Sequence, residues 1–307
     1  MKTCRILVLN YNGISLLEKF LPSVIEAAAE SRYDCKVTVL DNASQDGSAS
    51  YVRERFPGVD VYEAAENKVL CSYNQALLDC AEDIAILLNN DIQPEKGFVD
   101  PLIEPFLKES DVFFTATHGD CPTACWRWGI LSAELDDQGY TDRIKKPGVS
   151  FSAGIAAFDR DKFNLLGGYD ELYLPGRYED VDLCFRGWKK GWRGIYVPAS
   201  RKYHVGGASF EKAFTPKETQ AMVFRNGILF MIKNITNFFF MARFVIGTLV
   251  KVLASIILFR WQFVFGFWGA LRRFPQALEA RKKAKLHFQI SDREVLNLVN
   301  GVGKPKK

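Results

Sequence analysis

The sequence predicts an α/β protein built on a mostly parallel central sheet, and three observations point to this fold class. Short apolar runs rich in β-branched residues alternate with helix-like segments through the N-terminal third, which is the pattern of a doubly wound sheet. Several of these runs stop at asparagine or aspartate, as strands do when they deliver polar groups to a sheet edge. The chain has 307 residues, of which 48% are hydrophobic, so it can bury a substantial core.

The N-terminal third contains four expected strands with helices between them. The first helix is expected to begin at Ser15, whose hydroxyl is placed to cap it. The fourth strand is expected to stop before Pro94, which has no N–H to donate to a continuing ladder. We expect strands at residues 4–10, 36–41, 59–64 and 84–88, and helices at residues 15–31, at 72–81 and in a segment that ends near residue 56.

The middle of the chain gives fewer regular signals. We expect a strand in VFFTATH, a second from Ser150, a turn from Asp159 to Asp161, and a helix from Val181 to Lys190. A short strand follows, and then a loop that bears His204. Residues 118–148 show no clear period. Long irregular stretches in compact domains are commonly functional, so we expect acceptor specificity to lie there.

Polar residues stand where three of the expected strands end. The stretch ILLNNDIQP runs from apolar residues into Asn89, Asn90 and Asp91, the second strand ends at Asp41, and the first is followed by Tyr11. Ordinary turn chemistry explains any one of these groups. Because parallel strands share the direction of their carboxyl ends, the three together predict a binding site at that edge of the sheet.

Five motifs in order make the chain resemble family 2 glycosyltransferases. They are VLDNASQDGS, LLNND, LGGYDE, YEDVDLCFR and YHVGG, and they span roughly residues 4 to 210. The resemblance implies the GT-A fold, which is Rossmann-like with a mostly parallel central sheet flanked by helices. It also implies an inverting, nucleotide-sugar-dependent enzyme similar to the bacterial rhamnosyltransferases of surface-polysaccharide assembly.

The resemblance further implies roles for individual residues. Tyr11 stacks on the nucleotide base, Asp41 accepts a hydrogen bond from it, and Asp180 is the general base that deprotonates the acceptor hydroxyl. Asp91 binds a divalent metal ion, and His204 completes or supports that site. The nucleotide-sugar-binding set is Asn10, Tyr11, Asn12, Asp41, Asn67, Asn74 and Asn90, and secondary candidates are Glu179, Asp182 and Gly168.

The chemistry of a sugar diphosphate explains why these residue types are needed. Its two phosphates require a hard cation with oxygen ligands, and Mg²⁺ keeps waters, so the single carboxylate of Asp91 can suffice. An imidazole ligand at His204 favours Mn²⁺ over Mg²⁺. Glu179, Asp180 and Asp182 crowd three acids into four residues, which raises the pKa of at least one and suits a base.

Plain structural roles remain open for several of these residues. Asp180 suits the first turn of the helix that follows it, where acids are favoured, and Asp182 suits a supporting position. His204 taken alone is an ordinary surface histidine. The sequence departs from the family at Val69, where glycine is common, and its acidic triplet is reduced to Asn89, Asn90 and Asp91.

The C-terminal region differs from the rest in charge and in apolar content. From Arg225 onward there are 15 Lys and Arg against 3 Asp and Glu, whereas the preceding residues hold 25 against 33. Cations interrupt the interior of the apolar stretch from Phe224 to Phe274 at Lys233, Arg243, Lys251 and Arg260. We expect helices that lie in a membrane interface with lysine and arginine snorkelling to headgroups.

Two alternatives to interfacial helices remain. One is a soluble helical subdomain packed on the protein or on a second subunit, and the other is a single tilted span from Phe244 to Leu271. A basic group follows and favours an anionic leaflet; it comprises Arg272, Arg273, Arg281, Lys282, Lys283 and Lys285.

The sequence therefore predicts a GT-A catalytic domain at residues 1–215 and a helical, basic, membrane-associated region at 216–307. The expected partners are a nucleotide-diphosphate sugar, a lipid-linked or glycan acceptor and an anionic membrane surface, with no nucleic acid. The expected place is the cytoplasmic face of the inner membrane, since no signal peptide is evident and the seven cysteines suit a reducing compartment. Two rivals are a sugar nucleotidyltransferase, although no glycine-rich phosphate loop is visible, and a degenerate, non-catalytic binding protein.

Overall fold

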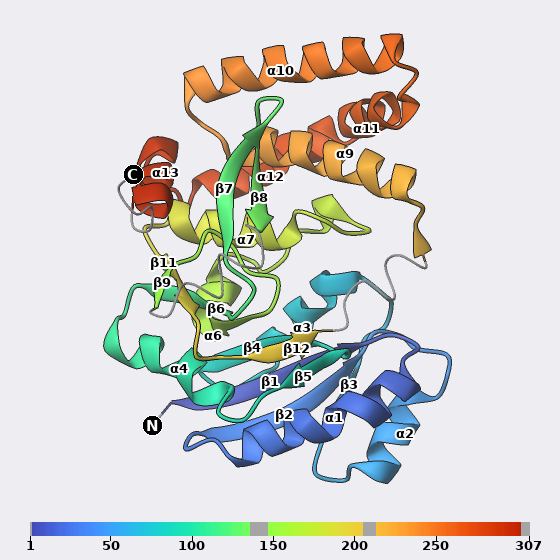
Figure 1. The fold of residues 1–307 in the computed structure, drawn as a ribbon, viewed down its shortest axis with the longest axis vertical. Helices are drawn as coiled ribbons and strands as arrows, with labels where there is room; N and C mark the ends of the chain where they lie inside the picture. Colours follow the sequence, from blue (N-terminus) through green and yellow to red (C-terminus); the bar gives the residue numbers. More distant parts are fainter. Residues whose placement is uncertain (1, 136–146, 205–212, 302–307) are drawn as a thin grey trace.

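The computed structural model describes residues 2–135, 147–204 and 213–301, and a large twisted sheet lies at its centre (Figure 1). The strands are β1 (Thr3–Asn10), β2 (Asp34–Asp41), β3 (Asp60–Glu63), β4 (Ile84–Asn89), β5 (Ile92–Pro94), β6 (Val112–Thr117), β7 (Pro122–Arg127), β8 (Ile130–Leu135), β9 (Gly148–Val149), β10 (Ala156–Asp159), β11 (Arg193–Val197) and β12 (Lys202–His204). The helices are α1 (Ile14–Ala29), α2 (Ser48–Arg55), α3 (Tyr73–Leu78), α4 (Val99–Lys108), α6 (Arg160–Leu165), α7 (Glu179–Lys189), α9 (Pro216–Asn234), α10 (Phe238–Ile257), α11 (Trp261–Arg272), α12 (Phe274–Lys285) and α13 (Asp292–Gly301), with 3₁₀ turns η1 (Val69–Ser72) and η2 (Glu171–Tyr173).

The central sheet is mostly parallel, as the sequence predicts. Among the described residues its strand order is β3-β2-β1-β4-β10-β6-β11-β9. The pairs β3–β2, β2–β1, β1–β4 and β6–β11 are parallel, whereas β10 and β9 run antiparallel to their neighbours. The carboxyl ends of β1, β2 and β4 consequently meet at one edge, where the expected polar residues follow them.

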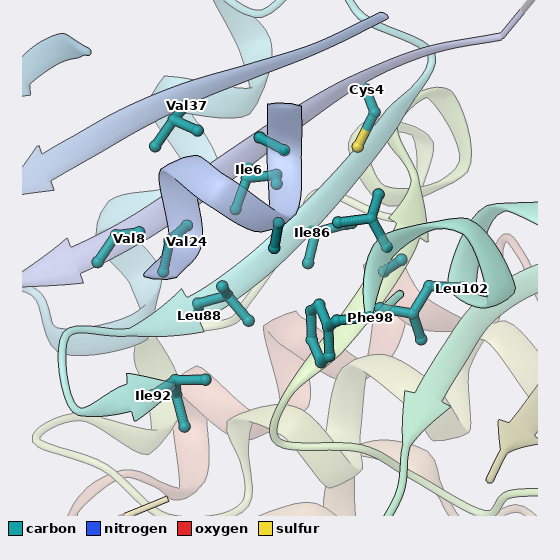
Figure 2. Close-up of a cluster of buried hydrophobic side chains, with 14 of the residues drawn as sticks. Cys4, Ile6, Val8, Val24, Val37, Ile86, Leu88, Ile92, Phe98 and Leu102 are labelled. Atoms are coloured by element: carbon teal, nitrogen blue, oxygen red, sulfur yellow. The ribbon is translucent and has the colours of Figure 1, made fainter. Parts of the chain in front are cut away.

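Two apolar layers cover the faces of this sheet. Alternate side chains of β1 point to opposite faces, so Ile6 and Val8 join one buried cluster and Leu7 joins the other. The first cluster packs β1, β2 and β4 against α1, α2 and α4 (Figure 2). The second packs the same strands against α3, α6 and α7. The strand edge is therefore held rigidly between two cores.

Three expectations about local structure are wrong. Ser15 does not cap α1; the N-cap is Gly13, and Asp46 accepts the Ile14 N–H instead. Asp159 opens a helix rather than a turn, because its carboxylate caps α6 at the Lys162 N–H. The segment that bears His204 is not a loop but the strand β12, which pairs with β5 in a separate two-stranded sheet. The fourth strand does stop before Pro94, because β4 ends at Asn89.

The C-terminal helices share a core with the part of the chain that carries the central sheet. Helix α9 begins at Pro216 with Thr215 as its cap, at the expected boundary. Beyond that boundary, a third buried cluster joins Tyr178 and Phe185 to Phe230 and other residues of α9. The fully buried Asp182 accepts bonds from Lys233 and Asn234 of α9 across this junction.

Helix α10 lies at the end of the molecule farthest from β1, β2 and β3, and the β7–β8 hairpin reaches up to it (Figure 1). The contact is a close one, because a Cβ added to Gly247 would meet the Trp128 carbonyl oxygen at 2.2 Å. Arg243 lies 5.1 Å from the Trp126 ring, and Lys251 lies 3.9 Å from the Phe263 ring. These two cations thus lie over protein aromatics, and the expectation that lysine and arginine of this region reach lipid headgroups stays a prediction.

Helix α10 exposes mainly apolar side chains, together with Arg243. Its exposed large apolar residues are Phe238, Phe239, Val245, Ile246, Leu249, Val250, Leu253, Ile256 and Ile257. In the described part of the chain, α10 is the one helix whose length and composition suffice to cross a membrane. A single span from Phe244 to Leu271 is not present, since the helix breaks between Ile257 and Trp261.

Candidate active site

A cavity of about 570 Å³ opens at the carboxyl ends of the parallel strands. Tyr11 and Asn42 line it from the ends of β1 and β2, and Asn90 and Asp91 line it from the end of β4. Glu179, the first residue of α7, lines the opposite side. This is the edge where open α/β sheets bind ligands.

Beneath the cavity, polar side chains tie the three strand ends together. The Asn90 side-chain amide nitrogen donates to the Asn10 side-chain Oδ1 at 2.7 Å, and the Asn10 side-chain amide nitrogen donates to the Asp41 carboxylate at 3.1 Å. All three residues are buried. Gly13 packs over this chain of bonds, because a Cβ there would lie 2.3 Å from the Asn90 amide nitrogen. Asn10 and Asp41 therefore hold the floor of the site, and neither lines the cavity itself.

Asn42 is a site residue that the sequence reasoning missed. Its amide donates to Asn67 at 2.8 Å and its oxygen accepts from Ser72 at 2.5 Å, which joins the β2 end to η1. The sequence signal that could have identified Asn42 is its position directly after Asp41, at the end of a predicted strand. Val69, which replaces the common glycine, has φ +52° and lines the cavity. The backbone keeps the left-handed conformation that glycine favours, and valine adopts it under strain.

Asp91 and His204 come together through the small β5–β12 sheet. His204 pairs in register with Ile92, which places its Nε2 3.3 Å from the Asp91 carboxylate. When two ligand atoms each lie about 2.1 Å from one metal ion and the angle between them at the ion is a right angle, they are about 3 Å apart. The 3.3 Å between His204 and Asp91 therefore fits a shared divalent cation. No group of three or more acidic, histidine or cysteine side chains suited to a metal occurs within the described residues. Other ligands would come from waters or phosphate oxygens.

The acids at the start of α7 follow a strained turn. Arg177 and Tyr178 have φ values of +74° and +78°, in the left-handed region that residues other than glycine rarely adopt. This conformation turns the chain sharply into α7, so that Glu179 faces the cavity and Asp180 follows in the first helical turn. Strain of this kind persists where the surroundings impose it, and it is common at active sites.

A second acid lies beside Asp180. Gly154 separates the two, since a Cβ built on it would lie 3.7 Å from Asp120 and 3.8 Å from Asp180. Asp120 accepts from the backbone N–H groups of Gly154 and Ile155. The sequence reasoning missed Asp120, because it falls at the start of the stretch without a clear period.

Burial and neighbouring carboxylates raise the pKa values of Asp180 and Glu179 to different extents. Burial together with the nearby Asp120 carboxylate raises the pKa of Asp180 to about 6. Burial and the adjacent Asp180 charge raise the pKa of Glu179 to about 8, and its Oε2 has no hydrogen-bond partner among the described residues. At neutral pH, Asp180 is therefore ionised and able to take a proton, while Glu179 is mostly protonated.

Four of the predicted site residues have structural roles outside the cavity lining. Both polar atoms of the Asn74 amide bond to the Tyr169 backbone, and Gly168 packs directly against that amide. Asp182 is enclosed by Arg186, Lys233 and Asn234, and Asn12 accepts from the Gln45 N–H in an exposed loop. The contacts of Asn74 and Asn12 in this structure are with the protein itself, and their roles in binding the nucleotide sugar stay predictions. Residues 205–207 of YHVGG, and 136–146 of the expected acceptor segment, lie outside the described residues.

The fold and the site together define an α/β enzyme with its ligand cavity at the carboxyl edge of a Rossmann-like sheet. The model of glycosyl transferase family 2 matches residues 5–166. The chain belongs to this family. It is 25% identical over 235 residues to N-acetylglucosaminyl-diphospho-decaprenol L-rhamnosyltransferase of Mycobacterium tuberculosis strain H37Rv, a match that covers 65% of this chain and 75% of the relative.

Two solved glycosyltransferases share the fold at 17% sequence identity. GalNAc-T7 with UDP, GalNAc and Mn²⁺ matches with a TM-score of 0.59 over 76% of this chain and 48% of its own. The mannosyltransferase PcManGT from Pyrobaculum calidifontis, in complex with GDP-Man and Mn²⁺, matches with a TM-score of 0.55 over 98% and 79%. The GT-A fold predicted from the sequence is thus confirmed, and the chain is a glycosyltransferase of family 2.

Proposed function

We propose that the protein is an inverting glycosyltransferase that moves a sugar from a nucleoside diphosphate to an acceptor hydroxyl. The observation that carries the proposal is the single cavity that Asp91 and His204 line from one side and Glu179, next to Asp180, from the other. A metal-binding pair suits the diphosphate of a donor. A buried acid that is ionised at neutral pH suits the activation of an alcohol.

In the proposed reaction Asp180 takes the proton from the acceptor hydroxyl as its oxygen attacks the anomeric carbon. The bond from that carbon to the phosphate oxygen breaks, and the nucleoside diphosphate leaves with the electron pair. Attack on the face opposite the leaving group inverts the anomeric centre. Glu179, protonated in the resting enzyme, supplies a hydrogen-bond donor inside the cavity.

Asp91 and His204 are the residues that would hold Mn²⁺ or Mg²⁺ in this site. A bound divalent cation neutralises the charge that develops on the leaving diphosphate. The imidazole favours Mn²⁺, and both solved relatives named above contain it. Tyr11 and Asn67 line the cavity and would contact the nucleotide. Asn10 and Asp41 fix the ends of the strands below the cavity.

The proposed acceptor is a lipid-linked saccharide presented at the cytoplasmic face of a membrane. The name of the rhamnosyltransferase relative contains a decaprenol-linked acceptor. The exposed apolar side chains of α10 suit burial in the headgroup and acyl boundary, where apolar area provides the affinity. The basic group contributes fewer free charges than expected, because Arg273 and Arg281 donate to backbone carbonyls of the protein.

A product assay tests this proposal. Purified protein is incubated with a panel of uridine, guanosine and thymidine diphosphate sugars, with Mn²⁺ or with EDTA, and with a prenyl-diphosphate-linked sugar as acceptor. We expect metal-dependent release of nucleoside diphosphate and an inverted linkage by NMR. Pyrophosphate as product would instead identify a nucleotidyltransferase. Binding without turnover across the panel would indicate a degenerate protein.

A further inference from the structure

The chain between η2 and α7 is held by side chains of the C-terminal helices in addition to its own turn bonds, such as that from the Gly176 N–H to the Tyr173 carbonyl. This loop, residues 174–178, contains the two left-handed residues Arg177 and Tyr178 and leads directly into Glu179. Pro175, Arg177 and Glu179 all line the cavity. Its backbone path therefore decides where the acids of α7 stand.

One side chain of α9 gathers three carbonyl groups of this segment. The amide nitrogen of Asn226 lies 2.7 Å from the carbonyl oxygens of Tyr173 and Gly176, and 2.8 Å from that of Arg177. Asn226 is fully buried. An amide carries two hydrogens, so the three acceptors share them, and the nitrogen is saturated by the loop.

Two arginines complete the set of donors. Arg225 donates to the carbonyl of Leu174 at 2.7 Å, and Arg273 donates to those of Leu172 and Leu174 at 2.8 Å. The Asn226 oxygen in turn accepts from Arg225. Backbone carbonyls from residue 172 to residue 177 thus converge on cationic and amide donors of α9 and of Arg273, between α11 and α12.

The helix also approaches the turn too closely for a larger residue. A Cβ added to Gly227 would lie 2.9 Å from Ile130 and 3.0 Å from the Tyr178 hydroxyl oxygen. Glycine at this position lets α9 bring Asn226 within hydrogen-bond reach of the loop. The close approach is a packing observation and does not depend on the hydrogen bonds.

We propose that Asn226 is a positioning residue for the transfer reaction. By binding the carbonyls of residues 173–177 it holds the left-handed turn at Arg177 and Tyr178, and so fixes Glu179 and Asp180 against the cavity. This inference rests on the proposed function for its kinetic part. It makes the C-terminal helices a component of the catalytic centre in addition to any role at a membrane.

The test compares Asn226→Ala with Asn234→Ala, a matched control on the same helix. Asn234 is also fully buried, but its amide donates to Asp182 and not to the loop. We expect Asn226→Ala to lower kcat on the order of 10- to 100-fold, since small displacements of reacting groups have effects of this size. The KM for the nucleotide sugar should stay within about twofold, because donor contacts are on the strand side. Asn234→Ala should lose thermal stability with little change in kcat.

Hydrogen–deuterium exchange of the full chain supplies a readout independent of turnover. Peptides covering residues 170–182 should exchange faster in Asn226→Ala than in wild type or Asn234→Ala, while peptides of β1 and β4 stay unchanged. Unchanged exchange, or unchanged kcat in a folded variant, would overturn the inference. If wild type transfers no sugar, the proposed function fails and exchange alone decides whether Asn226 holds the loop. Should Asn226→Ala not fold, Arg225→Gln is expected to show smaller changes in the same direction.

Discussion

Asp180 lies in the first turn of α7, with the carboxylate of Asp120 across Gly154 from it. Burial and that neighbouring charge raise its pKa to about 6. A general base must be ionised to accept a proton, so kcat/KM should fall as the pH drops through the pKa of Asp180. Below that pKa, kcat/KM should be proportional to the hydroxide concentration, and above it kcat/KM should be constant. Asp180→Asn should lower kcat by about 10² to 10⁴-fold without loss of donor binding.

Asp120→Asn is the matched variant for this pH dependence. Its side-chain oxygen can still accept from the N–H groups of Gly154 and Ile155, so the loop is retained. The like charge is removed, which lowers the pKa of Asp180 and moves the acid limb of the profile to lower pH. A limb that stays in place in Asp120→Asn, or that survives in Asp180→Asn, would exclude Asp180 as the titrating base.

Helix α10 exposes a set of large apolar side chains as well as Arg243. Arg243 and Lys251 lie over aromatic rings of the β7–β8 hairpin and of α11. We expect Leu249→Asp to abolish flotation with vesicles of phosphatidylglycerol and phosphatidylethanolamine at high salt, because a carboxylate cannot enter the apolar boundary at low cost.

Leu107→Asp on α4 is the control for that experiment. Leu107 is 50% exposed and Leu249 is 51% exposed, so the two substitutions remove comparable apolar surface from different faces. Flotation of Leu107→Asp should match wild type. If wild type itself stays soluble and monomeric without lipid and does not float, α10 does not bind a bilayer, and a second protein surface becomes the candidate for its outer face.

The junction of α7 and α9 makes a prediction about stability. Burial by itself would raise the pKa of Asp182, yet Arg186 and Lys233 beside it hold that pKa well below its usual range. Removing one partner of a buried ion pair leaves an uncompensated charge, so Lys233→Ala should lower the free energy of unfolding by about 3 to 5 kcal/mol in urea titrations. The exposed pair of Lys282 with Glu279 is the comparison, and Lys282→Ala should cost less than about 1 kcal/mol.

The pH dependence of this stabilisation has a defined sign. The pKa of Asp182 is lower in the folded protein than in the unfolded chain, so its contribution is present above the ordinary aspartate range. It is lost as pH falls through the lowered value. Equal sensitivity of Lys233→Ala and Lys282→Ala to urea would show that the buried network does not stabilise the junction.

For the whole molecule, the strands were predictable because their signal is local. Runs such as Ile84–Asn89 are continuous and apolar, and buried parallel strands have this composition. The parallel edge then brought Asn10, Asp41 and Asn90 together, as the sequence predicts. The β5–β12 pairing was missed because each strand has only three residues and the segment that bears His204 was expected to be a loop.

The site was only partly predictable, because several of its contacts join distant parts of the chain. Asn74 bonds to Tyr169, which no local pattern reveals, so it was assigned to the nucleotide. Asp120 acquires its place beside Asp180 through Gly154. The positions of Arg243 and Lys251 over aromatic rings are set by a hairpin more than a hundred residues away in the sequence. Periodicity alone does not show which side of a helix the protein covers.

The central claim is that residues from β4, β12 and α7 form one metal-dependent donor site. Calorimetric titration with uridine, guanosine and thymidine diphosphates, each with and without Mn²⁺, tests it most directly in wild type, Asp91→Asn and Asp180→Asn. The account predicts that one nucleotide binds wild type and Asp180→Asn with Mn²⁺, and that Asp91→Asn loses this metal-dependent binding. Nucleotide binding that does not depend on Mn²⁺, or that is unchanged in Asp91→Asn, would contradict a metal-dependent donor site.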